Sequence, residues 1–178
     1  MFWMNHFVTE LDSYGSYAPY MFQYYNLMQT HALGNFKEFV RAVGVNSPML
    51  IYLNGFENTS NNPNENYARE LFELFTLGEN NNYTQEDIIQ ASRALTGYNH
   101  WDDPGAQIYF DQSTWDESPK TVFGSEEFYT YDELIDTFFE LRETEIAQFI
   151  CTKLYKYFVS NEYDAITQED IINPLAQT

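Results

Sequence analysis

The side chains best suited to chemistry in this sequence lie in the segment NPNENYARELFELFTLG, residues 62–78. An α-helix turns by about 100° per residue, and this winding places Glu65 and Arg69 on the polar face of the segment. Glu70 projects from the edge of the apolar face, where a carboxylate needs a partner or acquires a raised pKa. Glu70 is therefore interpreted in two ways: as half of a buried ion pair with a Lys or Arg from another helix, or as a general acid/base or metal-binding carboxylate.

Glu65, Arg69 and Glu73 follow one another at four-residue spacing. This spacing predicts a Glu–Arg–Glu ladder on a solvated helix face, with each pair contributing about 0.2–0.5 kcal/mol. Glu65 and Arg69 are also candidates for catalysis, together with Glu70, in the enzymatic interpretation of the chain.

The histidines are the other candidates for proton transfer or metal binding. His6 lies between Trp3 and Phe7 on an apolar stripe. It is interpreted either as a core residue hydrogen-bonded to the backbone or as a neutral imidazole that binds a metal or transfers a proton near pH 7. His31 is expected to end a helix just before Gly34, where a positive charge would interact favourably with the helix dipole.

An acidic loop is predicted near residues 99–125. Its carboxylates could bind a divalent cation such as Ca²⁺, although their spacing does not match an EF-hand loop. A solvated acidic loop is the other interpretation. The cluster comprises His100, Trp101, Asp102, Asp103, Asp111, Asp116 and Glu117.

The elements that must position these groups are predicted to be helices, because apolar residues recur at helical spacing between capping signals. Asn35 followed by Glu38 is a capping pair for the helix expected over 36–44, and Thr84 is predicted to cap the helix expected over 85–97. Asn62 is expected to cap the segment that Gly78 ends. The helices are expected over 2–11, 20–29, 36–44, a short stretch from 47, 62–78, 85–97, 131–141, 144–158 and a short or kinked stretch from 168.

The string TQEDII occurs twice, at 84–89 and at 167–172, and is interpreted as the same helix start used twice. Within the acidic loop, IYFD (108–111) and KTVFG (120–124) are predicted to pair as a small hairpin. The fold class expected is therefore mainly α: an irregular multi-helix bundle with one acidic loop or small hairpin insertion near 99–125. We expect residues 1–178 to form a single helical domain that is a piece of a longer protein.

The composition supports a folded core and excludes several classes of protein. Of the 178 residues, 44% are hydrophobic and 19% aromatic, and disordered chains lack such aromatic content. The 27 Asp and Glu exceed the 8 Lys and Arg, giving a net charge of −19. A chain this acidic lacks the basic surface that binding to nucleic acid or to an anionic membrane requires.

Cysteine content and hydropathy also argue against a disulfide-stabilised protein and a transmembrane protein. Cys151 is the one cysteine, so a disulfide framework within the chain is excluded, and Cys151 is interpreted as a small buried hydrophobic residue. No apolar run approaches the roughly 18 residues that a transmembrane helix needs. The sequence also lacks a basic leader, a phosphate-binding glycine loop, a nucleophile elbow and an HExxH motif.

Six segments together resemble the large bacterial family catalogued as domain of unknown function number eighteen hundred. They are FWMNHF (2–7), HALGNFKEFVRAV (31–43), NPNENYARELFELFTLG (62–78), YTQEDIIQASRALTGY (83–98), FDQSTWDESPKTVFG (110–124) and FICTKLYKYFVS (149–160). The resemblance implies a protein more than twice this length and, in many members, export from the cell. It implies no particular activity, because none is established for the family.

Two positions depart from the family pattern. Met4 stands where the first motif usually has a histidine, and Trp115 stands where another histidine is usual. If the family binds a metal through those histidines, this chain has lost two ligands. The polar positions that match the pattern are His6, Asn64, Glu65, Arg69, Glu70, Asp116 and Lys120.

The function expected from the sequence is that of an uncharacterised exported bacterial domain, non-catalytic or of undetermined activity, acting as a surface interaction module with a glycan or protein partner. It would lie in the periplasm, on the cell surface or outside the cell. The alternative is an exported, hydrolase-like enzyme that uses His6 and Glu70 on an extracellular polymer or small polar substrate. The enzyme hypothesis predicts that these two side chains converge in a concave site. The module hypothesis predicts a contiguous patch with exposed Trp101, Trp115 or tyrosines, and a Glu70 closed off by a salt bridge.

Overall fold

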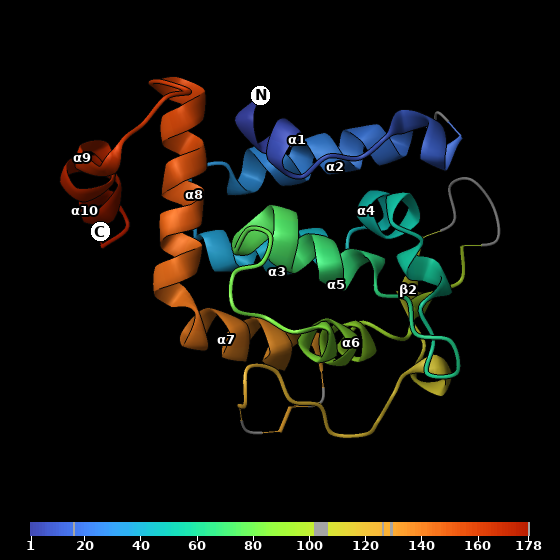
Figure 1. The fold of residues 1–178 in the computed structure, drawn as a ribbon. Helices are drawn as coiled ribbons and strands as arrows, with labels where there is room; N and C mark the ends of the chain where they lie inside the picture. The colour runs from blue at the N-terminus through green and yellow to red at the C-terminus, as the bar shows by residue number, and fades with distance from the viewer. Residues whose placement is uncertain (16, 102–106, 126, 129, 178) are drawn as a thin grey trace.

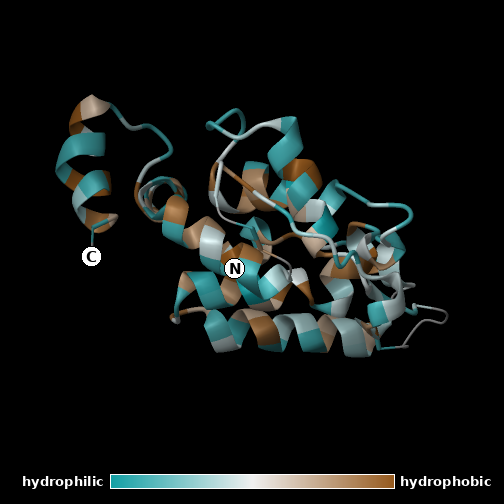
Figure 2. Cartoon of the chain, turned by 90° about the horizontal axis from the view of Figure 1, so that it is seen from below, coloured by the Kyte–Doolittle hydropathy of each residue, from teal (hydrophilic) through white to brown (hydrophobic). Residues whose placement is uncertain are grey.

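The computed structural model describes residues 1–15, 17–101, 107–125, 127–128 and 130–177. The described chain is mainly helical, as predicted, and it contains one short antiparallel strand pair. Figure 1 shows the helices of the first two thirds stacked in layers, with α8 running along one side of the stack. The C-terminal helices lie on the opposite side of α8 and stand apart from the stack (Figure 2).

The first part of the chain contains α1 (Phe2–His6), the 3₁₀ turn η1 (Leu11–Tyr14), α2 (Ala18–His31), α3 (Phe36–Gly44), α4 (Ser47–Tyr52), η2 (Gly55–Glu57), α5 (Asn66–Glu70) and the π-helical segment η3 (Leu71–Thr76). The second part contains α6 (Gln85–Ala94), β1 (Tyr98–Asn99), β2 (Tyr109–Phe110), η4 (Gln112–Thr114), α7 (Tyr131–Leu141), α8 (Glu143–Phe158), α9 (Ala165–Thr167), the π-helical η5 (Gln168–Ile172) and α10 (Asn173–Leu175).

Two helices begin at the residues predicted to cap them. The Asn35 side chain accepts a hydrogen bond from the backbone N–H of Glu38 at 3.1 Å. Thr84 and Asp87 form a reciprocal capping box, in which each side chain bonds the backbone N–H of the other residue. Both caps depend on partners three residues away, so the local sequence is sufficient to specify them.

Two predicted helix boundaries are wrong. The first helix ends at His6 rather than near residue 11. The helix expected to start at Asn62 begins at Asn66, because the Asn58 side chain accepts the backbone N–H of Asn64 at 2.8 Å. The Asn64 side chain in turn accepts the N–H of Asn66, so this stretch forms a side-chain-supported turn before α5.

The second TQEDII string does not repeat the helix start of the first. Asp164, three residues earlier, caps α9 by accepting the N–H of Thr167 at 2.9 Å. Residues 168–172 then continue the helix in π-helical form. The prediction of a cap at Thr167 is therefore wrong, because a competing cap residue upstream starts the helix one turn earlier.

The predicted hairpin between 108–111 and 120–124 is also wrong. The strand β2 pairs antiparallel with β1, and Tyr98 lies opposite Phe110. Residues 120–124 contribute only an isolated bridge to Phe128 among the described residues. An acidic loop with a small strand pair does occupy this region, but its partner strand comes from the end of α6.

Gly97 explains why β1 and β2 pair. Its φ of +96° lies in the left-handed region, so the chain turns sharply after α6. The Gly97 carbonyl accepts the N–H of Asp111 at 2.7 Å and extends the ladder by one bond. This backbone contact places the chain after β2 beside the end of α6.

The main core is rich in aromatic side chains from α2, α3, η3 and α7. Phe39, Phe72 and Phe138 are fully buried within it. The predicted apolar stripe of α8 is only partly covered: Ile150 is buried, whereas Phe158 is 69% exposed. The exposed end of this stripe is the C-terminal end of α8.

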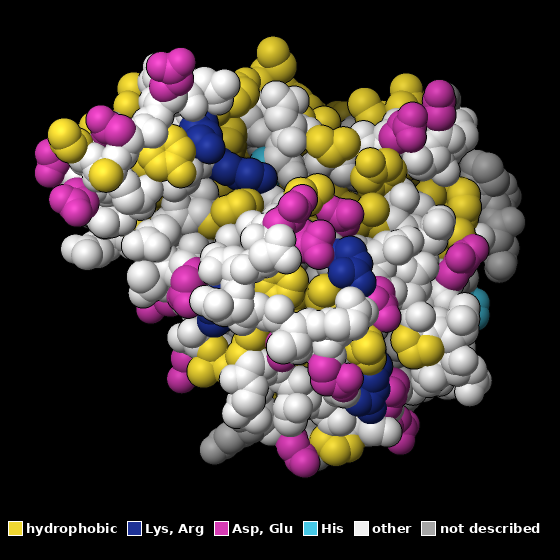
Figure 3. Space-filling model, viewed as in Figure 1, with side chains coloured by type: hydrophobic (Ala, Val, Ile, Leu, Met, Phe, Trp, Pro, Cys, Tyr) yellow, Lys and Arg dark blue, Asp and Glu magenta, His cyan; other side chains and the backbone are white. Residues whose placement is uncertain are grey.

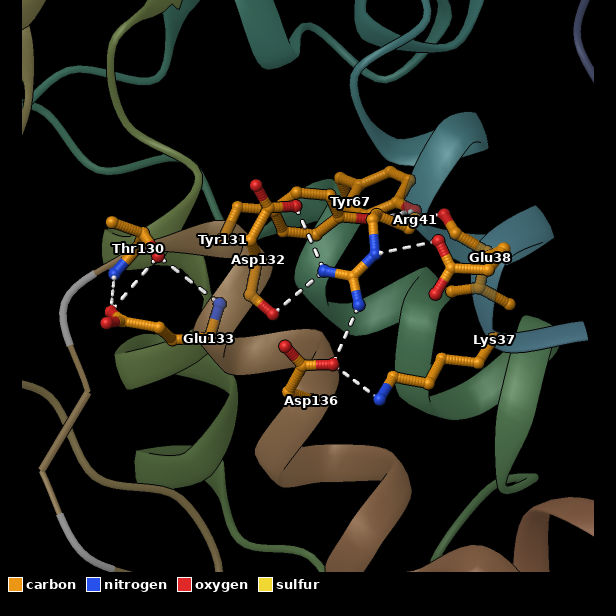
Figure 4. Close-up of polar contacts among 10 residues, drawn as sticks. Lys37, Glu38, Arg41, Tyr67, Thr130, Tyr131, Asp132, Glu133 and Asp136 are labelled. Carbon is orange, nitrogen blue, oxygen red and sulfur yellow. Dashed lines mark hydrogen bonds and ion pairs between the residues drawn. The ribbon is translucent and has the colours of Figure 1, made fainter.

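A surface network of ion pairs joins α3 to α7 (Figure 4). Arg41 bonds Asp132 at 3.0 Å and Asp136 at 2.8 Å, and it also contacts Glu38 on its own helix. Lys37 pairs with the same Asp136. The carboxylates are more than half exposed, so solvent screening limits the contribution of each pair to about 0–1 kcal/mol.

Candidate functional site

A cavity of about 180 Å³ lies between α1, α4, the α5–η3 helix and α8. His6 and Glu70 both line it, so the structure brings together the two side chains on which the enzymatic interpretation depends. No hydrogen bond joins His6 to Glu70 in the described part of the chain. The lining residues are Asn5, His6, Val8, Tyr52, Leu53, Glu70, Leu74, Phe75 and Lys153.

His6 is positioned by α1 with only 6% of its surface exposed. Its Nε2 lies 3.0 Å from the carbonyl oxygen of Phe75, and a carbonyl can only accept, so Nε2 carries the hydrogen. Its Nδ1 is therefore the acceptor, and the Lys153 ammonium lies 3.4 Å from it. Both ring nitrogens are engaged, as expected for a core histidine bonded to the backbone.

The surroundings of His6 keep the imidazole neutral. Burial disfavours the imidazolium, and the charge of Lys153 disfavours it further, so the pKa of His6 falls to about 3 despite the Phe75 carbonyl. A general base works best with a pKa near the working pH. His6 is thus poorly matched to proton transfer at neutral pH.

Lys153 is the charged residue at this site that the sequence analysis did not single out. It donates to the carbonyl of Leu74 at 2.7 Å and lies 4.7 Å from the centre of the Phe149 ring. Leu74 and Phe75 belong to the last turn of η3, where helix carbonyls lack intrahelical partners. Lys153 and His6 therefore cap the end of η3.

Glu70 has no ion pair in the described part of the chain, so the predicted structural partner is not found there. One of its carboxylate oxygens, Oε2, is shielded from solvent and has no hydrogen-bond partner among the described residues. Burial raises the pKa of Glu70, the charge of Glu73 raises it further, and Arg69 opposes the shift. The carboxylate thus has unused bonding capacity beside the cavity.

Glu65 and Arg69 form the predicted ladder and do not line the cavity. Arg69 lies 2.9 Å from Glu65 and 3.4 Å from Glu73, and Gln85 donates to Glu65. The polar groups of this ladder are occupied by one another. Their arrangement is that of a half-exposed structural ladder between α5 and α6.

His31 has the environment expected for it, whereas Cys151 is less buried than expected. His31 lies in the last turn of α2 and stacks on Phe39 with ring centres 5.3 Å apart. Cys151 is a free, half-buried thiol whose pKa is raised by burial, so it is not activated as a thiolate.

The acidic loop does not form a cation site in its described part. His100 bonds Asp111 at 2.8 Å, and Asp111 also accepts from Ser113. No group of three or more His, Cys, Asp or Glu suited to a metal occurs among the described residues, and Asp102 and Asp103 lie outside them. Trp101 and Trp115, expected to be exposed in the binding module, are only partly exposed, and Trp101 packs against Phe56 with ring centres 4.8 Å apart.

Asp116 and Lys120 belong to a partly buried cluster of polar groups that also contains Arg93 and Ser118. Burial raises the pKa of Asp116, but hydrogen bonds from Arg93 and Ser118 outweigh it and lower the pKa to about 2. Lys120 is 1% exposed, donates to the carbonyls of Asp116 and Ser118, and lies 5.3 Å from the Trp115 ring centre. Trp115 therefore packs against this lysine.

A signal for Lys153 was present in the sequence. Phe149 and Ile150 belong to the apolar stripe of α8, and a residue three or four positions later lies on the same helix face. A lysine at position 153 must therefore place its charge at the edge of the core. Its partners on η3 lie 79 residues away and could not be inferred.

The chain is thus a mainly helical protein with a small cavity that has apolar walls and a few polar groups. Comparison with known families identifies the family to which it belongs. The family described as "Protein of unknown function (DUF1800)" matches residues 1–178, so the chain belongs to that family. No curated protein and no solved structure matches the chain. None of the described helices combines the length and the apolar character needed to cross a bilayer.

Proposed function

We propose that this chain is a non-catalytic binding module of an exported protein, and that the cavity beside Glu70 receives a hydroxyl group of a neutral glycan. The observation that carries the proposal is the Oε2 atom of Glu70, which is shielded from solvent and has no hydrogen-bond partner among the described residues. An unsatisfied buried acceptor costs about 1–3 kcal/mol, and a donor on a ligand would remove that cost. Export is inferred from the family resemblance and fits an acidic chain with one cysteine.

The size and lining of the cavity support a small polar ligand. Its volume of about 180 Å³ is below the range typical of drug-sized ligands, so it would hold one sugar ring rather than a longer segment. Tyr52 and Phe75 supply aromatic surface, and Asn5 supplies an amide. This combination of apolar walls with few polar groups is common in ligand sites.

A second candidate function is favoured by the pKa of Glu70, which burial and Glu73 raise as a general acid requires. In this alternative the chain is an exported, hydrolase-like enzyme acting on an extracellular polymer. The alternative needs a second proton-transfer group, and the bonded, neutral His6 is a poor one. This difference favours the binding module.

The test is an NMR titration of the ¹⁵N-labelled chain with neutral disaccharides: cellobiose, xylobiose, maltose and N,N′-diacetylchitobiose. We expect at least one sugar to shift the amide signals of Asn5, Leu53 and Leu74. Glu70→Leu should weaken that binding about tenfold or more, because it removes a charged acceptor. Glu73→Leu is the matched control, since Glu73 lies on the same helix outside the cavity lining.

Two results would overturn the binding module. One is the absence of shifts at the cavity with every sugar; the other is equal weakening by Glu70→Leu and Glu73→Leu. Hydrolysis of a sugar that Glu70→Leu abolishes and Glu73→Leu preserves would establish the enzyme instead.

A further inference from the structure

A second cavity, of about 270 Å³, lies on the other side of His6 and Lys153. It is formed where α1 meets the C-terminal half of α8. Its lining contains two lysines and no carboxylate, in a chain whose net charge is −19. The lining residues are Phe2, Asn5, His6, Lys153, Lys156, Tyr157 and Asn161.

The two lysines of this cavity differ from the other cations of the chain. Lys153 and Lys156 form no ion pair with any described carboxylate, whereas the buried Lys120 is held by backbone carbonyls. The remaining Lys and Arg residues each contact at least one carboxylate within 3.4 Å: Lys37, Arg41, Arg69, Arg93 and Arg142. Figure 3 shows dark-blue side chains beside a histidine between α8 and the N-terminal helix.

An aromatic ring lies beside each of the two ammonium groups, and Lys153 is in addition partly buried. Lys156 lies 4.8 Å from the Tyr163 ring centre, and burial lowers the pKa of Lys153. Phe2 and Tyr157 meet edge to face at 5.4 Å and form an apolar wall. A charge interacts more strongly with a counter-ion when less water surrounds it.

Two amides complete the polar part of the cavity. The side chains of Asn5 and Asn161 are exposed and make no hydrogen bond within the described residues. Each amide can donate to an oxyanion, the Lys156 ammonium can supply up to three donors, and Lys153 has one donor left beside its contacts with Leu74 and His6. The chain thus offers an anion several donors that no described carboxylate occupies.

From this juxtaposition we infer that the cavity lined by Lys153, Lys156 and Asn5 binds the carboxylate of a small organic acid that carries an aromatic or apolar body. The lysines and amides bind the carboxylate, and Phe2 and Tyr157 pack against the body. Inorganic phosphate satisfies the charge but lacks the body, so it should bind more weakly. This proposal and the glycan proposal concern different cavities: Asn5, His6 and Lys153 line both, but Glu70 lines only the glycan cavity and Lys156 lines only this one.

The experiment titrates the intact ¹⁵N-labelled chain with benzoate, with the neutral isostere benzamide and with inorganic phosphate at constant ionic strength. Benzoate should shift the amide signals of Asn5, Tyr157 and Asn161 and bind more tightly than either of the other probes. Lys156→Gln should weaken benzoate binding about tenfold, since it removes one charged hydrogen bond. Lys156 is exposed, so this variant should fold, and circular dichroism checks that it does.

Lys37→Gln is the matched control, because Lys37 is a surface lysine already paired with Asp136 and outside the cavity. It should leave benzoate binding unchanged. The inference is overturned if benzamide binds as tightly as benzoate, if phosphate binds more tightly than benzoate, or if Lys156→Gln and Lys37→Gln have equal effects. Loss of benzoate binding in Glu70→Leu would show instead that both cavities form one site.

Discussion

Replacing Glu70 by Gln should make the folded chain more stable at pH 7, because the native carboxylate is held without a partner. The side chain has one oxygen shielded from solvent and no ion pair among the described residues. Gln has the same shape but no charge, so it removes the additional cost of desolvating a carboxylate, and about 1 kcal/mol is appropriate because Glu70 is only half-buried. We therefore expect Glu70→Gln to raise the free energy of unfolding by about 1 kcal/mol.

The stabilisation by Glu70→Gln should depend on pH, because folding shifts the pKa of Glu70. The folded state raises the pKa of Glu70 above its usual value of 4.5, so the native chain binds more protons than the unfolded chain just above that pH. Stability contributed by this group is therefore lost as pH rises through the folded pKa, and it is recovered on acidification. The advantage of Glu70→Gln should be present at pH 7 and should shrink towards zero near pH 4.

The assay is thermal unfolding followed by circular dichroism at pH 7 and pH 4. A gain of about 1 kcal/mol corresponds to a rise in Tm of roughly 2–4 °C for a chain of this size. Glu73→Gln is the control, because Glu73 is paired with Arg69 at 3.4 Å and should lose a few tenths of a kcal/mol or nothing. A clear destabilisation by Glu70→Gln at pH 7 would refute the reasoning, since it would mean that the carboxylate has a stabilising partner.

Three further predictions test the surrounding structure. The ring signals of His6 should not titrate above about pH 4 in NMR spectra. In the wild type, His6 should lower the free energy of unfolding by at most roughly 5 kcal/mol as pH falls from 6.5 towards about 3, and His6→Gln should remove this loss. In urea unfolding, Thr84→Ala should cost about 1 kcal/mol by removing a cap, whereas Thr167→Ala should cost less than about 0.5 kcal/mol. Arg142→Met should lower the free energy of unfolding by roughly 3 kcal/mol, since Arg142 is 6% exposed and donates to the carbonyls of residues 81 and 82. A decrease below about 1 kcal/mol would show that Arg142 does not anchor the 81–82 turn.

Local sequence was sufficient where both partners of an interaction lie within one helical turn. The Thr84 cap was predictable because its partner, Asp87, is three residues away. The Glu65–Arg69–Glu73 ladder was predictable because four-residue spacing places side chains on one helix face. The mainly helical class follows from many such local signals, and the family resemblance rests on residues that the chain retains.

The start of α5 and the strand pairing were missed because each depends on a contact that spans more than one helical turn. The start of α5 is delayed by the Asn58 side chain, which captures a backbone N–H six residues later. Asparagine and proline are common in both turns and helix starts, so composition could not separate the two. The strand pairing required the left-handed conformation of Gly97, which is compatible with either a helix end or a strand turn.

The site shows how bonding capacity is divided among its charged and polar groups. His6 and Lys153 each donate to a carbonyl at the end of η3, and they also contact one another. The lone pair that His6 would need for proton transfer thus faces an ammonium group. Glu70 and Lys156, by contrast, are not paired with an opposite charge among the described residues.

This division favours ligand binding over catalysis. Catalysis by acid and base requires two groups that can exchange protons with a substrate, and the neutral, doubly engaged His6 does not supply the second. A bound ligand requires only that donors and acceptors remain available, and Glu70 and Lys156 provide one of each on opposite sides of His6. Met4 packs against the core and Trp115 lies beside the Lys120 ammonium, so neither side chain adds a group that could transfer a proton.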